Sequence, residues 1–141
     1  MTIGAILASK GSQVVSIRSS DRVSDAVAML AERRIGALPV IDDGRVVGIF
    51  SERDVVYSIA KVGAAALEAR IGDIMTAPAM TVDPDTAVMS GLSLMTKRRI
   101  RHLPVVRDNQ VIGFISIGDL VKYRIDRIEA EAAAMRDYIA S

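Results

Sequence analysis

The stretch ALPVIDDGRVVGIFSERD, residues 37–54, repeats its layout in HLPVVRDNQVIGFISIGD, residues 102–119. A shift of 65 positions aligns residues 14–58 with residues 79–123 without a gap, and 13 of the 45 aligned pairs are identical. Many of the other pairs exchange one apolar residue for another. The chain therefore contains a duplicated unit, and the fold follows from what one unit forms.

Each copy predicts the same order of elements. A short β-rich run (residues 14–17 and 79–82) precedes turn and capping residues, among which Pro84 suits the start of a helix. The next segment has apolar residues at helical spacing, which in the first copy are Val23, Ala26, Val27 and Leu30. Two apolar runs then flank a hairpin turn signal at 42–44, matched by 108–109. A second helix follows, so the order is β-α-β-β-α, twice.

The composition excludes several classes of function. Half of the 141 residues are hydrophobic, enough for one domain or for two small halves that share a core. With 18 basic and 17 acidic residues, the chain has no general attraction to nucleic acid or acidic lipid. Without cysteine, there is no disulfide, thiolate catalysis or cysteine-bound metal. No signal-peptide pattern or long apolar run is present, so we expect a soluble cytoplasmic protein.

Ser51 with Asp54, and Ser116 with Asp119, stand where a strand is expected to end and a helix to begin. A helix N-terminus offers unpaired N–H groups to an anion, and a carboxylate there can accept hydrogen bonds from the two hydroxyls of a ribose. The same Ser-x-x-Asp spacing is a capping box, which needs no ligand. Gly118 costs the second helix about 1 kcal/mol, and its bare backbone favours a close approach by another group. Both roles stay open, and one serine can serve both.

The element order, the LPV strand and the Gly-x-x-Ser-x-x-Asp ending resemble the cystathionine β-synthase (CBS) domain. Two in tandem resemble a Bateman module, the adenine-nucleotide-sensing unit attached to many enzymes and transporters. The resemblance implies an α/β (α+β) fold, with two β-α-β-β-α units packed as a pseudo-two-fold pair. We expect a stand-alone module with units at 1–66 and 67–126 and a C-terminal amphipathic helix at 127–141.

The resemblance also implies two nucleotide sites. Asp54 and Asp119 would bind ribose, with Ser51 and Ser116 nearby on ribose or phosphate. The segment that enters each half would complete the site of the other half. Candidates are Thr76, Ala79 and Met80 (within 75–80) for the Asp54 site, and Lys10 and Val14 (within 9–14) for the Asp119 site. Adenine would then contact backbone groups and apolar walls.

The two copies differ just before LPV, where the first has Gly36-Ala37 and the second Arg101-His102. In the family a basic residue here reaches the phosphate of the bound nucleotide, so we expect Arg101 and His102 to serve the Asp119 site. The first half would bind weakly, bind another ligand or use Arg53 for the phosphate. The alternative for His102 is a strand or surface residue with no special task.

Three competing functions are less well supported. Residues 97–102 (KRRIRH) hold five basic residues in six positions, but no aromatic residues interleave and part of the run ends a helix, where basic side chains are favourable. A triad of Ser116, His102 and Asp119 lacks a nucleophile elbow, and its Ser and Asp recur in a copy without histidine. One histidine and scattered carboxylates do not indicate a metal site. We expect neither nucleic-acid binding, nor catalysis, nor a metal.

The last segment has apolar residues at alternating spacings of four and three, a heptad seam formed by Val121, Ile125, Ile128, Ala132, Met135 and Ile139. Fewer than three heptads is short for an isolated coiled coil, so we expect this segment to dock onto the module or onto a partner subunit. CBS modules tend to dimerise as flat discs through their helices, and we expect a homodimer.

Together these observations predict a regulatory module that binds an adenine nucleotide. AMP is the first candidate, with ADP, ATP and NAD as alternatives, and no cofactor is required. The module would report cellular energy or redox state to a protein target. The other reading is a structural or protein-interaction dimerisation module whose Ser-x-x-Asp segments only cap helices.

Overall fold

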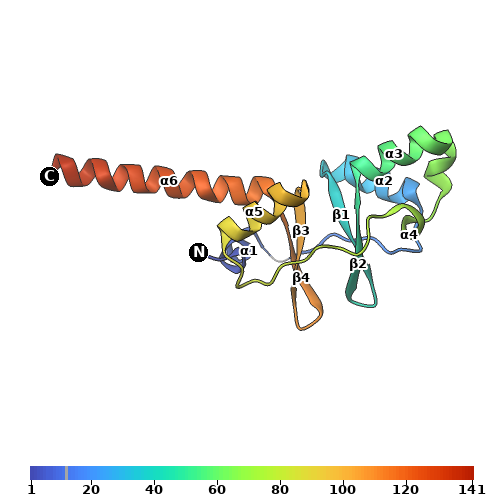
Figure 1. Ribbon diagram of the computed structural model, residues 1–141, viewed down its shortest axis with the longest axis horizontal. Helices are drawn as coiled ribbons and strands as arrows, with labels where there is room; N and C mark the ends of the chain where they lie inside the picture. Colours follow the sequence, from blue (N-terminus) through green and yellow to red (C-terminus); the bar gives the residue numbers. More distant parts are fainter. Residues whose placement is uncertain (12) are drawn as a thin grey trace.

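The computed structural model describes residues 1–11 and 13–141. Two β-hairpins stand side by side, each with its own helices (Figure 1). The α/β organisation in two similar halves is therefore as predicted. The elements are α1 (Ile3–Lys10), α2 (Val23–Arg33), β1 (Ala37–Asp42), β2 (Arg45–Ser51), α3 (Glu52–Val62), the 3-10 helix η1 (Gly63–Glu68), α4 (Ile71–Ile74), α5 (Val88–Arg98), β3 (His102–Arg107), β4 (Gln110–Ser116) and α6 (Ile117–Ala140).

The hairpins form as the turn signals predict. β1 pairs antiparallel with β2, and β3 pairs with β4 in the matching register. Both central residues of each turn have positive φ: Asp43 at 50° and Gly44 at 78°, Asp108 at 53° and Asn109 at 63°. Two positive φ angles define the type I′ turn, whose twist matches that of the strands, and Asp, Asn and Gly adopt them most readily.

The runs at 14–17 and 79–82 are not full strands, which corrects the expectation. Each contributes a single parallel bridge, through Ile17 to β1 and through Val82 to β3. A hydrogen-bonded turn begins at the very next residue in both halves. The pairing therefore cannot extend past Ile17 or Val82 toward the C-terminus.

Pro84 lies within the second of these turns and does not start a helix. The Thr86 amide donates to the Asp83 carbonyl at 3.0 Å, and the Asp85 amide donates to the Asp83 carboxylate at 2.7 Å. α5 begins only at Val88. The expected helix start is wrong because the Asp83 side chain stabilises a turn around the proline.

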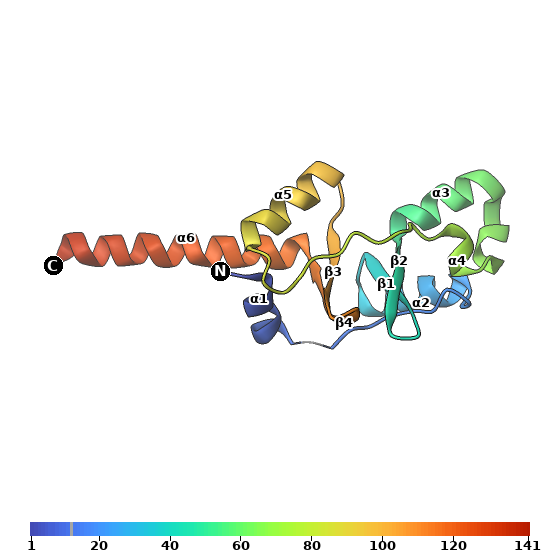
Figure 2. The same cartoon turned by 60° about the horizontal axis from the view of Figure 1, so that its bottom comes forward.

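The short helices α1 and α4 each pack against the half that they do not directly precede in the sequence. α1, which the sequence pattern does not predict, buries Ile3, Ile6 and Leu7 in the core of the second half. α4 buries Ile71 in the core of the first half. Figure 2 shows α1 beside β4 and α6, and α4 beside β2 and α3. Each half therefore depends on a segment that precedes the other half in sequence.

α2 confirms the helical spacing read from the sequence. Val23, Ala26 and Leu30 are buried in the core of the first half, and Val27 packs against it. The same core contains Phe50 from β2, which is fully buried. The apolar face of α2 thus covers the hairpin beneath it.

α6 is a single helix of 24 residues that extends away from both halves (Figure 1). Its apolar seam does not dock onto the module, since the exposed fraction is 49% for Ile125, 48% for Ile128 and 59% for Met135. A partner subunit remains as the expected docking surface. The borders at 66/67 and 126/127 fall within η1 and α6 and stay a prediction. No helix within residues 1–11 and 13–141 is long and apolar enough to cross a membrane.

Candidate functional site

Asp54 lies in the first turn of α3, directly after β2. Ser51 caps the helix: its Oγ accepts from the Asp54 amide at 3.4 Å, and the Asp54 Oδ2 accepts from the Ser51 amide at 2.9 Å. The Ser51 hydroxyl also lies 3.2 Å from the same carboxylate oxygen. The capping box read from the sequence is confirmed, and it fixes the orientation of the carboxylate.

Thr76 holds the other oxygen of this carboxylate. Its hydroxyl donates to Asp54 Oδ1 at 3.0 Å, while its backbone exchanges two 2.9 Å hydrogen bonds with Ile49 of β2. This close approach requires Gly48, because a Cβ there would lie 2.7 Å from the Met75 Sδ and 2.8 Å from the Thr76 carbonyl oxygen. The segment after α4 therefore completes the surroundings of Asp54, as the resemblance implies.

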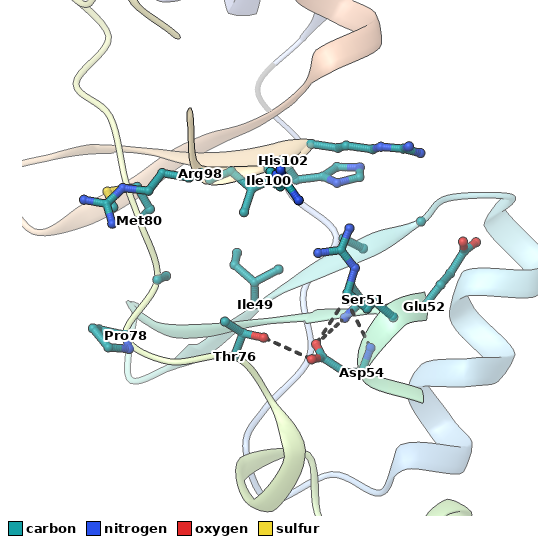
Figure 3. Close-up of a pocket in the computed structure, with 16 residues that line it drawn as sticks. Ile49, Ser51, Glu52, Asp54, Thr76, Pro78, Met80, Arg98, Ile100 and His102 are labelled. Atoms are coloured by element: carbon teal, nitrogen blue, oxygen red, sulfur yellow. Dashed lines mark hydrogen bonds between the residues drawn. The ribbon is translucent and has the colours of Figure 1, made fainter. Parts of the chain in front are cut away.

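A cavity of about 490 Å³ opens beside Asp54 (Figure 3). Asp54, Thr76 and Ile49 line one side, and Ile100 and His102 lie across from them. The segment between the halves supplies Pro78, Ala79 and Met80, and β1 supplies Ala37. The cavity thus combines a fixed carboxylate with several apolar walls, as expected of a site for a small molecule.

The charges around this cavity are mostly positive. Glu52 and Asp54 are its acidic residues, and its basic residues are Arg53, Arg98, Arg99, Arg101 and His102. Guanidinium groups bind phosphate and carboxylate through paired hydrogen bonds. Most of the basic run at 97–102 therefore faces a cavity that favours an anion.

Arg101 and His102, which we expected to serve the Asp119 site, also reach the cavity of the first half, while His102 remains close enough to Asp119 for its charge to act on the ring. Both residues line the cavity that contains Asp54, and of the described residues neither Asp119 nor Ser116 lines it. The reason is that β3 begins across from the N-terminus of α3, with the His102 ring close to Gly36. A Cβ on Gly36 would lie 3.7 Å from the His102 Cε1.

Asp119 has a different neighbour. Its capping box with Ser116 repeats that of the first half, with the Ser116 amide donating to Asp119 Oδ2 at 2.8 Å. The Lys10 ammonium donates to the same oxygen at 2.6 Å. Burial opposes ionisation, but the hydrogen bonds from Lys10 and Ser116 outweigh it and hold the pKa of Asp119 below 3.8. Val14 is half-buried, and Ser12, within the segment expected here, lies outside the described residues.

His102 lies between the two halves. Its ring stacks on Phe114, with centroids 5.4 Å apart and planes 12° from parallel. Burial and the nearby charge of Lys10 lower the pKa of His102 below 6.5, against the attraction of Asp119. The ring is therefore largely neutral at neutral pH. Within residues 1–11 and 13–141, no group of three or more His, Asp or Glu side chains could hold a metal ion.

The lowered pKa of His102 predicts an acid-sensitive stability. Between the folded pKa and 6.5, the unfolded chain binds more protons than the folded chain, so the free energy of unfolding falls as the pH drops below 6.5. His102→Gln should remove this part of the decline, measured by denaturant unfolding between pH 7.5 and pH 5. Asp42 and Asp119, whose pKa values lie below 3.8, lose their contributions only at lower pH. An unchanged slope in His102→Gln would contradict the assignment.

Sequence reasoning missed several lining residues of the cavity. Arg98 and Arg99 belong to a run that was visible in the sequence, and the C-terminus of a helix explained them without a site. Ile49 and Ile100 look like ordinary strand and turn residues. The sequence signal that these residues share is their position. Ile49 lies within the repeated Gly-x-x-Ser motif, and residues 98–100 come shortly before the repeated LPV strand.

Comparison with known proteins places the chain in a family. The model of the CBS domain matches residues 6–61 and 71–126. The chain is 35% identical over 147 residues to a mitochondrial CBS domain-containing protein of Arabidopsis thaliana, covering 98% of this chain and 71% of that protein. The crystal structure of a CBS-domain containing protein from Agrobacterium tumefaciens is 36% identical, with a TM-score of 0.83 over 87% of this chain and 92% of that one.

A third relative was solved with ligands. The CBS domain pair of protein MJ0100, in complex with 5′-methylthioadenosine and S-adenosyl-L-methionine, is 25% identical, with a TM-score of 0.79 over 90% of this chain and 98% of that one. The protein described here belongs to the CBS domain family and contains two CBS domains in tandem. CBS pairs are regulatory ligand-binding modules, and the cavity beside Asp54 is the candidate site in this chain.

Proposed function

We propose that this chain binds an adenine nucleotide in the cavity beside Asp54, with AMP as the first candidate and ADP, ATP or NAD as alternatives. One observation carries the proposal: a carboxylate held by Ser51 and Thr76 shares a cavity with four arginines and a histidine. A nucleotide has the complementary pattern, with a diol at one end and an anionic phosphate at the other.

Each part of the nucleotide has a matching surface. The amide and the hydroxyl of Ser51 donate to Asp54 Oδ2 and the Thr76 hydroxyl donates to Oδ1. One ribose hydroxyl can therefore use the free lone pair of Oδ1, and the other can replace the 3.2 Å contact from the Ser51 hydroxyl. The arginines across the cavity suit the phosphate. Ile49, Met80 and Ile100 offer apolar contact to the base, with backbone groups of 78–80 beside them. The two ligands of the MJ0100 pair are both adenosine derivatives, which favours this class of ligand.

In this proposal, binding reports cellular energy or redox state to a protein target, and the chain itself performs no catalysis. A cytoplasmic location stays a prediction. The second candidate is an interaction module without a ligand. The capping boxes favour it, because Ser51 and Asp54 satisfy each other without any bound molecule.

A thermal-shift experiment separates the two candidates. AMP, ADP, ATP and NAD are added at millimolar concentrations, and the melting temperature is measured. A ligand at 100 times its Kd adds about 2.7 kcal/mol to the free energy of unfolding, which for a chain of this size is a rise of roughly 5–15 °C. The double variant Asp54→Ala with Asp119→Ala should show no rise. No rise with any nucleotide would favour the interaction module.

We also infer a homodimer from the exposed helix faces. α3 and α6 each expose apolar side chains, and the most exposed of these are Val56, Tyr57, Val62, Ile125, Ile128, Met135, Tyr138 and Ile139. One neighbour of known structure, 28% identical with a TM-score of 0.74 over the whole of this chain and 88% of that one, is described as a hexameric CBS-CP12 protein from bloom-forming cyanobacteria. A second copy would bury these faces without a different partner.

Truncation after Ile125 tests the contribution of α6. It should raise the dimer dissociation constant by about tenfold, because the seam then loses its apolar contacts with the partner. The mass is measured by light scattering across a dilution series. Asp126→Ala with Asp137→Ala changes the opposite face of the same helix and should leave the mass unchanged. Equal masses for the truncated and full-length chains would show that α6 takes no part in self-association.

A further inference from the structure

The second half differs from the first at the positions that surround its aspartate. The shift of 65 places Phe114 at the position of Ile49, and Lys10 at the position of Met75. Ile49 lines the open cavity beside Asp54. In the second half, the side chain of Lys10 contacts Asp119, and the ring of His102 contacts Phe114.

Lys10 contacts both Asp119 and β4. At the end of α1, its ammonium donates to the Asp119 carboxylate at 2.6 Å and to the Phe114 carbonyl oxygen at 3.0 Å. The Asp119 side chain is 25% exposed. The ammonium therefore bridges the carboxylate and the strand edge, the two groups that Thr76 bridges in the first half through its hydroxyl and backbone.

His102 covers the ring of Phe114. Its ring lies flat on the Phe114 ring, at a centroid distance of 5.4 Å. Burial lowers the pKa of His102, so the ring stacks in its neutral form at neutral pH. The charged groups that act on it are Lys10, Asp119, Arg101 and Glu52.

We propose that Lys10 and His102 prevent nucleotide binding beside Asp119. Each chain then binds a single nucleotide, beside Asp54. This inference rests on the proposed function. Lys10 and the Ser116 amide both donate to Asp119 Oδ2, so a ribose would have only Oδ1 of this carboxylate. His102 covers the flat face of Phe114 that a base would need. The two halves keep the same backbone motif, yet only one presents it to a ligand.

The matched variant is Lys10→Met, which gives the second half the residue that the first half has at position 75. AMP and adenosine are titrated by calorimetry into three chains: Asp54→Ala, Asp54→Ala with Lys10→Met, and the latter with Asp119→Ala. We expect Lys10→Met to raise the affinity of the second half by about tenfold, since a charged acceptor becomes available. Asp119→Ala should then abolish this gain. Lys10→Gln serves as a second variant if Lys10→Met fails to fold.

Two calorimetric results would overturn the inference: a native chain that binds two nucleotides, or an Asp54→Ala chain whose AMP binding is lost with Asp119→Ala. A carboxyl-carbon NMR titration decides the Lys10 contact independently of nucleotide. The pKa of Asp119 should rise in Lys10→Met, and an unchanged pKa would refute the contact. A native chain that binds no adenine nucleotide would overturn the proposed function, and with it the single site, while the NMR titration still reports on Lys10.

Discussion

The Asp54→Ala variant should bind AMP at least about a hundredfold more weakly than the native chain. A ribose diol donates two hydrogen bonds to this carboxylate, and each bond to a charged group contributes roughly 1.5–3 kcal/mol, where 1.4 kcal/mol is about tenfold in affinity. Calorimetric titration measures the loss. Ligand-free stability must be recorded as well, because alanine also removes the bonds from Ser51 and Thr76.

Two controls sharpen this experiment. Asp54→Asn keeps the size of the side chain and can still accept a bond from Thr76, so a comparable loss of AMP affinity would point to the charge of the carboxylate. Asp119→Ala changes the matching position of the other half and should alter AMP affinity by less than about twofold, which is within the usual effect of distant, independent sites. The reverse outcome, with Asp119→Ala harmful and Asp54→Ala harmless, would place the nucleotide in the second half.

Local patterns account for the parts of the fold that the sequence predicts correctly. Asp43-Gly44 adopts positive φ with little strain, so the turn and its hairpin follow from two residues. Ser51 and Asp54 satisfy each other within one helical turn, so the start of α3 follows from four residues. The duplication then doubles both predictions without further information.

The incorrect and missing predictions depend on contacts between distant segments. α1 is stabilised by burying Ile3 and Leu7 in the second half, and no local signal in its eight residues requires a helix. Pro84 is held in a turn by Asp83 instead of starting a helix. Repeat alignment reveals which copy contains Arg101, but not that β3 begins across from α3 of the other copy. The composition of the candidate cavity therefore required the three-dimensional arrangement.

That arrangement changes the expected effect of Arg101→Ala. Arg101 lines the cavity beside Asp54, so its guanidinium is available to a phosphate bound there. Loss of a hydrogen bond between charged groups should weaken AMP by about tenfold to a hundredfold. Adenosine has no phosphate, so its affinity should change by less than about twofold. Calorimetric titration of both ligands in an Asp119→Ala background limits the readout to the first half.

The comparison of the two ligands identifies what Arg101 does. Equal losses for AMP and adenosine would show that Arg101 shapes the cavity without contacting phosphate. No loss for either ligand would indicate that Arg53, Arg98 or Arg99, which line the same cavity, contacts the phosphate in place of Arg101. Gly36→Arg, which gives the first copy the residue of the second, is the matched converse, since Gly36 also lies beside Glu52 and His102. If a positive charge near the phosphate is what matters, Gly36→Arg should partly restore AMP affinity in the Arg101→Ala chain and leave adenosine unchanged.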